Sequence, residues 1–249
     1  MLSLTTIKEL KKLRNKKYRT EFNRFIVEGE KMINELILNN IKADKIFTTI
    51  PSLFDKLSPI FPFIELIGER EMKQISVFDS FSPILAVVPF SEIPSFDSKH
   101  LQFPLLALDF IQDPGNLGTI IRTADWFGFK GIVCSENTVE RFNHKVVQAS
   151  MGAIFRMPML YTNLADFLKI SHLPSYGTFL NGENLYDMTL KKNAIYVIGN
   201  EANGISPEIE KLVSKRLTIP NFSVNSVKME SLNAALSTAI VCSEVARSS

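Results

Sequence analysis

Strand-length apolar runs alternate with segments of helical periodicity along most of the chain. In the N-terminal part, residues 25–27, 46–49 and 85–89 form apolar runs of strand length, and apolar side chains recur at helical spacing over residues 30–39. Residues 8–17 are polar and basic, which favours a helix or a turn. This alternation predicts a small α/β domain over about the first 90 residues.

The second part of the chain alternates more regularly. Apolar runs without a polar face, separated by helices, are typical of a parallel sheet that is covered on both sides. In such sheets, ligands bind at the carboxyl ends of the strands. The predicted strands are residues 105–108, 131–134, 157–160, 176–180, 194–198 and 216–219, and the predicted helices are residues 117–127, 146–152 and 229–247.

A change of composition separates the two parts. Pro89, Pro94 and Pro104 bracket a stretch rich in serine, aspartate and lysine, which is the chemistry of a linker. The chain is therefore predicted to consist of one domain at 1–90, a linker at 91–103 and a second domain at 104–249.

Composition is ordinary for a globular protein. Of the 249 residues, 45% are hydrophobic and 22% charged, and no apolar run approaches the roughly 20 residues that span a bilayer. We therefore expect a soluble, cytoplasmic protein without membrane contact and without a signal peptide. Cys134 and Cys242 lie among apolar neighbours and are interpreted as buried thiols. The three histidines have no partner at ligand spacing, so no metal site is expected.

Positive charge is concentrated near the N-terminus. Residues 8–24 hold eight basic side chains against Glu9 and Glu21, a local charge of +6 within a chain whose net charge is +2, so the remainder carries −4. Such a cluster attracts polyanions, because neutralising phosphates releases counterions. A solvated helix face explains the pattern about as well.

The first loop that can carry chemistry follows the predicted strand 105–108. It contains a proline–glycine turn, and Asn116 occupies the position expected of a helix N-cap. Arg122, further along the predicted helix, could grip a phosphate through a fork of hydrogen bonds. A surface ion pair with Asp125 is the alternative.

The second loop, residues 199–207, follows another apolar run and holds two glycines, two asparagines and Glu201. It fits neither the P-loop nor the dinucleotide pattern. Ser206 and Pro207 are expected to begin a helix as its N-cap and first turn. In the third stretch, Ser231 and Asn233 open the last helix, where they could cap it or face a ligand.

In this order and spacing, the three stretches resemble the TrmH (SpoU) family of RNA ribose 2′-O-methyltransferases, within the SPOUT superfamily. The match spans residues 105–247, and the N-terminal part is similar to a small ribosomal-protein-like domain. The motifs are Asp113-Pro114-Gly115-Asn116-Leu117-Gly118 with Arg122, Asp125 and Gly128; Gly199-Asn200-Glu201 with Gly204; Ile219-Pro220 followed by Ser231-Leu232-Asn233; a smaller block at 149–153; and, near the N-terminus, Tyr18-Arg19, 25–29 and 82–88.

The resemblance implies a fold and a cofactor. It implies an α/β protein with a SPOUT-type parallel sheet and a C-terminal trefoil knot, preceded by a small α/β ribosomal-protein-like RNA-binding domain. It further implies a homodimer with its active site near the subunit interface, and no metal. S-adenosylmethionine would be held at Leu180, Gly199, Asn200, Gly204, Ile219 and Leu232.

The resemblance also implies a reaction, methyl transfer to a ribose 2′-hydroxyl of structured RNA. Arg122 would be the central catalytic residue, and because a guanidinium keeps its proton, we expect it to hold the adjacent phosphate and stabilise the developing alkoxide. Asn116 would orient Arg122 or the ribose, Glu201 would orient Arg122 or a loop amide, and Ser231 and Asn233 would complete the site. RNA phosphates would be held by Lys11, Lys12, Arg14, Lys16, Lys17 and Arg19.

Two features depart from the family pattern. Residues 221–230 are longer than the usual short glycine-bearing link, which would change one wall of the cofactor pocket. Ala234 replaces a frequent valine, which would repack the last helix. Neither change removes a polar group expected to act.

Alternatives remain open at this stage. Large-subunit ribosomal RNA is the expected substrate, with transfer RNA as the second possibility. A catalytically silent RNA-binding protein of the same fold, or an enzyme of the superfamily that methylates a base nitrogen, would share the motifs. Cofactor binding would exclude the first of these, and locating the methyl group would exclude the second.

Overall fold

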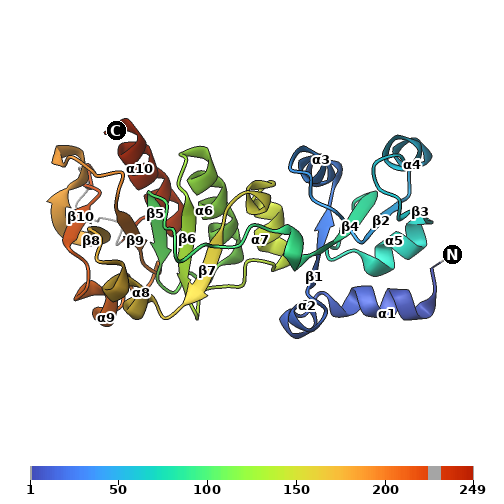
Figure 1. The fold of residues 1–249 in the computed structure, drawn as a ribbon, viewed down its shortest axis with the longest axis horizontal. Coiled ribbons are helices and arrows are strands. Elements are labelled where there is room, and N and C mark those ends of the chain that lie inside the picture. The colour runs from blue at the N-terminus through green and yellow to red at the C-terminus, as the bar shows by residue number, and fades with distance from the viewer. Residues whose placement is uncertain (1, 224–230, 249) are drawn as a thin grey trace. The chain divides into compact units, whose positions relative to one another are not determined.

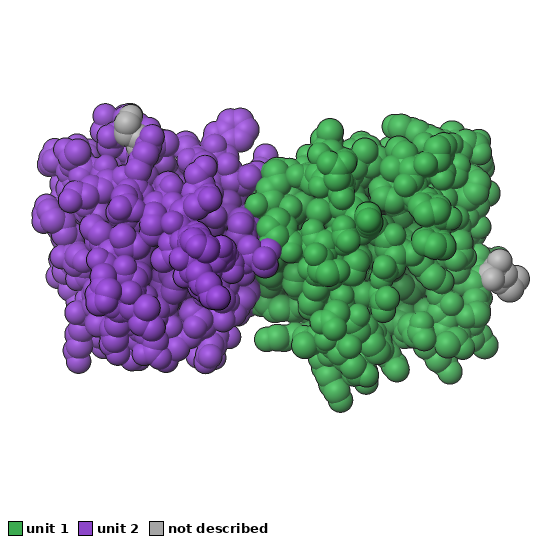
Figure 2. Space-filling model, viewed as in Figure 1, with its two compact units in different colours: residues 1–94, 140–156 green, residues 95–139, 157–249 purple. Residues whose placement is uncertain are grey.

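The computed structural model describes residues 2–223 and 231–248 and divides into two compact units. The first comprises Met1–Pro94 together with Glu140–Arg156, and the second comprises Ser95–Val139 together with Met157–Ser249 (Figure 2). Each unit therefore contains a segment that is distant in sequence from the rest of it. The predicted boundaries at 90 and 104 fall close to the first crossing of the chain between the units.

The first unit is built on a four-stranded sheet of order β1-β4-β2-β3 (Figure 1). Strand β4 is antiparallel to both of its neighbours, whereas β2 and β3 run parallel. Apolar side chains of the sheet and of α1 and α5 share one core. The elements are α1 (Leu4–Lys12), α2 (Lys16–Phe22), β1 (Arg24–Glu28), α3 (Glu30–Leu38), β2 (Lys45–Thr48), α4 (Pro51–Leu57), β3 (Ile64–Leu66), α5 (Glu69–Ile75), β4 (Ile84–Pro89), η1 (Phe90–Glu92), α7 (His144–Ala149) and η2 (Ala153–Phe155).

Local chemistry explains why these elements begin and end where they do. Ser3 caps α1 by accepting a hydrogen bond from the amide of Thr6 at 3.0 Å, and Asn15 caps α2 in the same way. Asn23 ends α2 in the left-handed conformation (φ 50°), which asparagine tolerates better than most residues. The predicted basic segment 8–17 is thus two short helices rather than one.

The second unit is a six-stranded parallel sheet of order β10-β8-β9-β5-β6-β7. Strands β5, β6 and β9 carry almost uninterrupted buried apolar residues, as the sequence predicts for a parallel sheet covered by helices, whereas β8 and β10 include polar positions. Helices α6 and α10 pack against each other. The elements are β5 (Leu105–Leu108), α6 (Pro114–Trp126), β6 (Gly131–Ser135), β7 (Met159–Thr162), α8 (Leu164–Ser171), β8 (Ser175–Asn184), η3 (Leu185–Asp187), β9 (Ile195–Ile198), α9 (Pro207–Glu210), β10 (Lys215–Thr218) and α10 (Ala234–Arg247).

Several sequence predictions need correction at the ends of elements. Helix α6 begins at Pro114 with Asp113 as its N-cap, so the expectation that Asn116 caps it is wrong. Helix α10 begins at Ala234, five residues later than predicted, and residues 229–230 lie outside the described residues. The sequence analysis missed α4, β3, α5 and α8, which are short and lack a long periodic stretch.

The sheet order puts a switch point in the middle of the second unit. From β5 the chain builds outward through β6 to β7, then returns to the other side of the sheet to form β8 and β9, and β9 pairs with β5. At such a point the loops after the two central strands diverge and leave a crevice at their carboxyl ends. Here these are the loops that carry the first two sequence motifs.

The predicted trefoil knot stays a prediction, since the path of the chain includes residues 224–230, which lie outside the described ranges. The expectation that the long 221–230 segment changes one wall of the cofactor pocket also stays a prediction, because most of that segment lies outside the described residues. Cys134 and Cys242 are buried free thiols, as predicted. In the part of the chain that the structure describes, no helix combines the length and the apolar composition that a membrane crossing requires.

Candidate active site

The loop after β9 has a conformation that only glycine permits at its first position. A Cβ atom on Gly199 would lie 2.3 Å from the backbone of Gly204 and Ile205. This close approach lets Asn200 and Gly204 form a pair of backbone hydrogen bonds of 3.0 and 2.9 Å. Gly204 has φ +66°, the left-handed region that glycine enters without strain. The glycines predicted to bind cofactor therefore shape the loop.

The side chain of Asn200 is used entirely inside this region. Its amide nitrogen donates to the carbonyl of Phe110 (2.9 Å), which follows β5, and its oxygen accepts hydrogen bonds from the amides of Ala202 and Asn203 at 2.8 and 3.1 Å. Asn200 thus ties the loop after β9 to the loop after β5. Because these hydrogen bonds occupy its side chain, the predicted contact of Asn200 with the cofactor would come from its backbone.

A second tie between the two loops comes from Asp109, the first residue after β5. Its buried carboxylate accepts a hydrogen bond of 2.7 Å from the amide of Ser206, which precedes α9 as its predicted N-cap residue. The sequence analysis did not single out Asp109. An acidic residue directly after a fully buried strand is the signal that could have identified it.

Three of the predicted catalytic side chains form one hydrogen-bonded row. Asn233 donates from Nδ2 to Oδ1 of Asn116 at 3.0 Å, and Asn116 donates from its own Nδ2 to Oε1 of Glu201. Asn233 also caps α10, because its Oδ1 accepts hydrogen bonds from the amides of Ala235 and Leu236. The three motifs, of which the first and the third are 117 positions apart, therefore converge at one site.

Ser231 joins the same site through the backbone of the loop. Its hydroxyl donates to the carbonyl oxygen of Glu201 at 3.4 Å. Both residues line a cavity of about 780 Å³ at the carboxyl ends of β8 and β9. A volume of this size is typical of small-molecule and cofactor sites. The cavity is lined by Thr178, Phe179, Leu180, Asn181, Ile198, Gly199, Asn200, Glu201, Ala202, Asn203, Gly204, Ile205, Glu210, Ile219, Ser231, Leu232, Ala234 and Ser237.

All six residues predicted to bind cofactor line this cavity. The sequence analysis missed the contribution of β8 beyond Leu180, and it also missed Glu210 and Ser237. The polar residues that interrupt β8 after Gly177 were the available signal.

Residues 178–182 leave the ladder between β8 and β10. The register runs from Arg216 opposite Gly177 to Leu217 opposite Glu183, so five residues of β8 have no partner on β10. We call this segment the 178–182 bulge. Its main chain is held by Thr218, whose hydroxyl donates to the carbonyl of Phe179 at 3.0 Å. The bulge forms the wall of the cavity opposite the loop after β9.

Arg122 is an exposed residue of α6. No hydrogen bond or ion pair joins it to another residue among positions 2–223 and 231–248, so the ion pair with Asp125 that the sequence left open is absent there. The guanidinium is therefore available to a ligand. The structure brings Asn116, Glu201, Ser231 and Asn233 together, whereas Arg122 lies six positions after Asn116 on α6 and forms no part of their hydrogen-bonded row.

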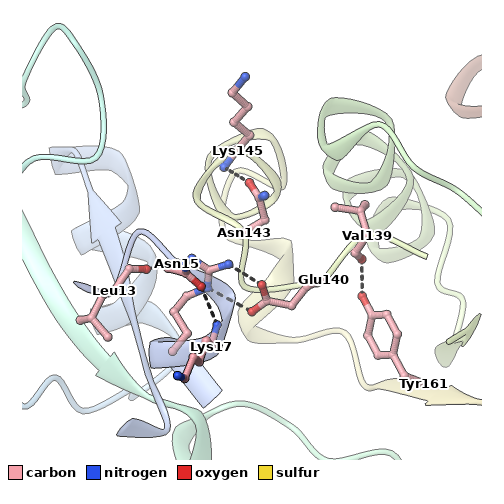
Figure 3. Close-up of polar contacts among 9 residues, drawn as sticks. Leu13, Asn15, Lys17, Val139, Glu140, Asn143, Lys145 and Tyr161 are labelled. Atoms are coloured by element: carbon pink, nitrogen blue, oxygen red, sulfur yellow. Dashed lines mark hydrogen bonds and ion pairs between the residues drawn. The ribbon is translucent and has the colours of Figure 1, made fainter. Parts of the chain in front are cut away.

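The residues predicted to hold RNA fall into two groups. Lys11 and Lys12 are exposed on α1, and Lys16 and Lys17 are exposed on α2. Arg19 is different, being 4% exposed: it donates to both carboxylate oxygens of Glu140 and, at 2.8 Å, to the carbonyl of Leu13 (Figure 3). A buried and paired guanidinium is not offered to phosphate, so this placement argues against the predicted RNA contact of Arg19. Arg14 is exposed but donates to the carbonyl of Ser76.

Comparison with known proteins agrees with this geometry. The SpoU rRNA methylase family matches residues 104–243, and an MRM3-like substrate binding domain matches residues 5–80. The chain is 30% identical to 23S rRNA (guanosine(2553)-2′-O)-methyltransferase RlmP of Bacillus subtilis, over 94% of this chain and 93% of that protein. It is 34% identical to the 23S rRNA (guanosine-2′-O-)-methyltransferase RlmB of Neisseria meningitidis over 57% of this chain and 58% of that one.

Solved structures show the same architecture over the whole chain. A TrmH-family protein from Porphyromonas gingivalis superposes with a TM-score of 0.87 at 37% identity and covers 100% of both chains. An rRNA methyltransferase from Sinorhizobium meliloti, solved with AdoMet bound, superposes with a TM-score of 0.85 at 27% identity, covering 99% of this chain and 97% of that one. The fold and the site define an RNA methyltransferase of the SPOUT type. The chain belongs to the SpoU rRNA methylase family.

Proposed function

We propose that this protein transfers a methyl group from S-adenosylmethionine to a ribose 2′-hydroxyl of 23S ribosomal RNA. The observation that carries the proposal is the row Asn233–Asn116–Glu201, which joins three separate motifs at the edge of a cofactor-sized cavity. The full-length relative RlmP supports ribosomal RNA as the substrate. Transfer RNA is the second candidate.

The cavity fits the cofactor by its shape and its chemistry. Gly199 leaves no room for a side chain, so a ligand can approach the backbone of the loop closely. Leu180, Ile219 and Leu232 offer apolar contacts, and the loop backbone offers amide and carbonyl groups to a purine. When bound, the cofactor supplies an activated sulfonium methyl group. Gly199, Asn200 and Gly204 would hold it through their backbone.

The protein's own side chains must align the ribose oxygen and assist the loss of its proton. Arg122, exposed and without an ion pair among the described residues, would hold the phosphate next to the target ribose and stabilise negative charge on the oxygen. Asn116 would hold Glu201 in a fixed orientation and so keep a carboxylate within reach of the ribose. Asn233 and Ser231 would fix Asn116 and the Glu201 backbone respectively.

The first unit would bring the RNA to the site. Its match to a substrate binding domain and the exposed lysines 11, 12, 16 and 17 support this role. Contacts of lysine with phosphate would give affinity without base specificity. We further propose a homodimer, as the family resemblance implies, and a location in the cytoplasm, as expected from the composition.

One experiment tests the reaction and its position together. The purified protein is incubated with isotopically methyl-labelled S-adenosylmethionine and unmodified 23S rRNA, and the RNA is digested and analysed by mass spectrometry. A labelled 2′-O-methyl nucleoside at one site is expected. Label on a base nitrogen would replace ribose by base as the target, and no label on 23S rRNA but label on tRNA would favour the second candidate substrate.

A further inference from the structure

A second cavity, of about 690 Å³, lies in the first unit where α2, β1, β2 and the end of β4 meet. It is far in sequence from the methyltransferase motifs, and the proposed reaction does not use it. Three phenylalanines contribute to its lining, together with two cationic and two anionic side chains. The lining residues are Phe22, Asn23, Arg24, Lys42, Ala43, Asp44, Phe63, Pro89, Phe90, Ser91 and Glu92.

We propose that this cavity seats an unpaired nucleotide of the RNA substrate, with its base against Phe63 and Phe22 and its phosphate beside Lys42. The inference rests on the proposed function, and it specifies which residues of the first unit contact the RNA strand.

The exposed ring is Phe63, which lies in the connection between α4 and β3. Its side chain is 66% exposed, although it lines the cavity. Leaving a phenylalanine ring in water forgoes the stabilisation that burying it would give. Bases of single-stranded nucleic acids stack on such rings in a way that tolerates any sequence. Phe63 therefore provides a platform on which a base can lie.

The walls of the cavity are braced by hydrogen bonds. The amide of Phe90 donates to the carbonyl of Asn23 at 2.9 Å, which joins the end of β4 to the end of α2. Arg24 donates to the carboxylate of Asp44, and that pair joins β1 to the residue before β2. The cavity thus exists before any ligand binds, which lowers the entropic cost of binding.

The charges of the cavity leave one cation free. Arg24 is paired with Asp44, and the carboxylate of Glu92 accepts a hydrogen bond of 2.9 Å from the backbone amide of Lys42. The ammonium group of Lys42 itself forms no ion pair within the described ranges, and this residue is exposed. A phosphate at the rim of the cavity could therefore form an ion pair with the ammonium group of Lys42.

The adjoining surface of α1 and α2 continues the same chemistry. Phe22 lines the cavity and stacks against Tyr18, with 6.0 Å between ring centroids. The ammonium of Lys12 lies 5.2 Å from the ring of Tyr18 and 5.9 Å from that of Phe22, and Lys17 lies 5.7 Å from Tyr18. Cations interleaved with aromatic rings are typical of surfaces that bind single-stranded RNA. The basic N-terminal cluster therefore leads directly to the cavity.

Fluorescence anisotropy of the full-length protein tests the proposal with two labelled probes, a short RNA without self-pairing and a fully paired RNA hairpin, at one fixed salt concentration. Phe63→Ala should weaken binding of the unpaired probe by about tenfold, the loss of one stacked base, and leave the hairpin unchanged. Phe63→Trp, which keeps an aromatic ring at this position, should bind the unpaired probe about as well as the wild type does. Ile60→Ala is the matched control, because Ile60 is 50% exposed in the same connection but does not line the cavity.

Lys42→Gln should lower the salt dependence of binding to the unpaired probe by about 0.7 in the logarithmic slope, as the loss of one phosphate contact requires. The proposal is overturned if Phe63→Ala binds the unpaired probe as the wild type does, or if it weakens both probes equally. Methyl transfer is measured separately. If Phe63→Ala loses binding of the unpaired probe but the wild type methylates no RNA, the proposed function alone is refuted. If the wild type methylates RNA but Phe63→Ala binds the unpaired probe normally, this inference alone is refuted.

Discussion

The guanidinium of Arg216 lies over the ring of Phe179, with 4.0 Å between its Cζ and the ring centroid. Arg216 belongs to β10, and Phe179 belongs to the 178–182 bulge that walls the cofactor cavity. The same guanidinium donates to the backbone carbonyl of Asn181 at 3.2 Å and to its side-chain oxygen, and it pairs with Glu210. The side chain of Arg216 thus holds the 178–182 bulge through both Phe179 and Asn181.

This relationship predicts that Arg216 positions the cavity wall. Arg216→Ala should raise the Kd for S-adenosylmethionine by about tenfold, since stacking and the charge-assisted hydrogen bonds to the bulge are lost together. The value of kcat at saturating cofactor should change little, because Arg216 is not among the residues that line the cavity. Calorimetric titration and steady-state kinetics measure the two quantities.

Lys215→Ala is the matched control for Arg216. Lys215 is the neighbouring cation on β10, and its ammonium lies 3.8 Å from Glu183 at an exposed position, so little change is expected. Arg216→Lys should keep the pair with Glu210 but lose the planar contact with Phe179, and should bind cofactor at an intermediate level. Equal cofactor affinity in the Arg216→Ala and Lys215→Ala variants would exclude the positioning role.

Two glycines of one loop should respond differently to the same substitution. Gly199→Ala would place a Cβ atom 2.3 Å from the backbone of Gly204 and Ile205, so the loop must move and cofactor binding should fall more than about tenfold. At Gly204 the Cβ would meet no atom within 4 Å, and Gly204→Ala carries only the strain of its positive φ, about 1 kcal/mol. Thermal melts with and without S-adenosylhomocysteine compare the variants. A cofactor-induced shift that survives in Gly199→Ala would contradict the prediction.

The carboxylate of Glu201 should matter for catalysis rather than for cofactor affinity. Glu201→Gln keeps an oxygen that can accept the hydrogen bond from Asn116, so the row of side chains can persist while the charge is lost. We expect kcat to fall by about a hundredfold, the typical contribution of a proton-transfer group, and the Kd for cofactor to stay within about twofold. Single-turnover methyl transfer measures the rate. A wild-type rate in this variant would reduce Glu201 to a structural residue of the loop.

The convergence of Asn116, Glu201 and Asn233 could be predicted because it follows from sheet topology. Asn116 and Glu201 follow adjacent parallel strands, whose carboxyl ends share one edge, and the third motif opens the helix that packs against α6. The alternation of strands and helices therefore predicted that ligands bind at this edge of the sheet, whereas the roles of the individual side chains came from the family resemblance and stay predictions. The glycines of the second loop were predicted as ligand contacts. The structure shows why glycine is needed at position 199: a Cβ atom there would collide with the backbone of Gly204 and Ile205.

Other parts of the site could not be predicted. The 178–182 bulge arises from a change of register between β8 and β10. The polar residues after Gly177 mark an interruption of the strand, but they do not give the register with which pairing resumes. The burial of Arg19 depends on Glu140, 121 positions away, so its place in a basic cluster suggested exposure instead. Both cases show that long-range pairing of polar groups determines which charged residues are free to bind a ligand.

Arg122 should be required for the chemical step. Arg122→Lys keeps a positive charge but loses the planar fork that can bind two oxygens, and we expect kcat to fall by about a hundredfold. Cofactor affinity should be unchanged, because Arg122 does not line the cavity. Lys169→Ala on α8 serves as a control for removal of a surface cation from the same unit. A variant that loses cofactor binding along with activity would show that Arg122 supports the cavity instead.

The first unit contains a carboxylate whose pKa is raised. Glu28 is buried at the end of β1, and burial raises the pKa of its carboxyl group above the ordinary value of 4.5, although hydrogen bonds from Val77 and Ser76 and the charge of Arg14 oppose the shift. A group that binds its proton more tightly in the folded state stabilises the fold below pH 4.5, and this contribution is lost as the pH rises through the folded-state pKa.

Glu28→Gln should therefore remove a pH dependence. The amide stays neutral, so the free energy of unfolding of the wild type should fall relative to that of the variant as the pH rises from about 4 to about 8. Urea unfolding followed by circular dichroism measures the difference at each pH. Glu30→Gln, at an exposed carboxyl two positions further along the chain, should leave the pH dependence as it is in the wild type. A difference between wild type and Glu28→Gln that is constant with pH would mean that the pKa of Glu28 is the same in the folded and the unfolded protein.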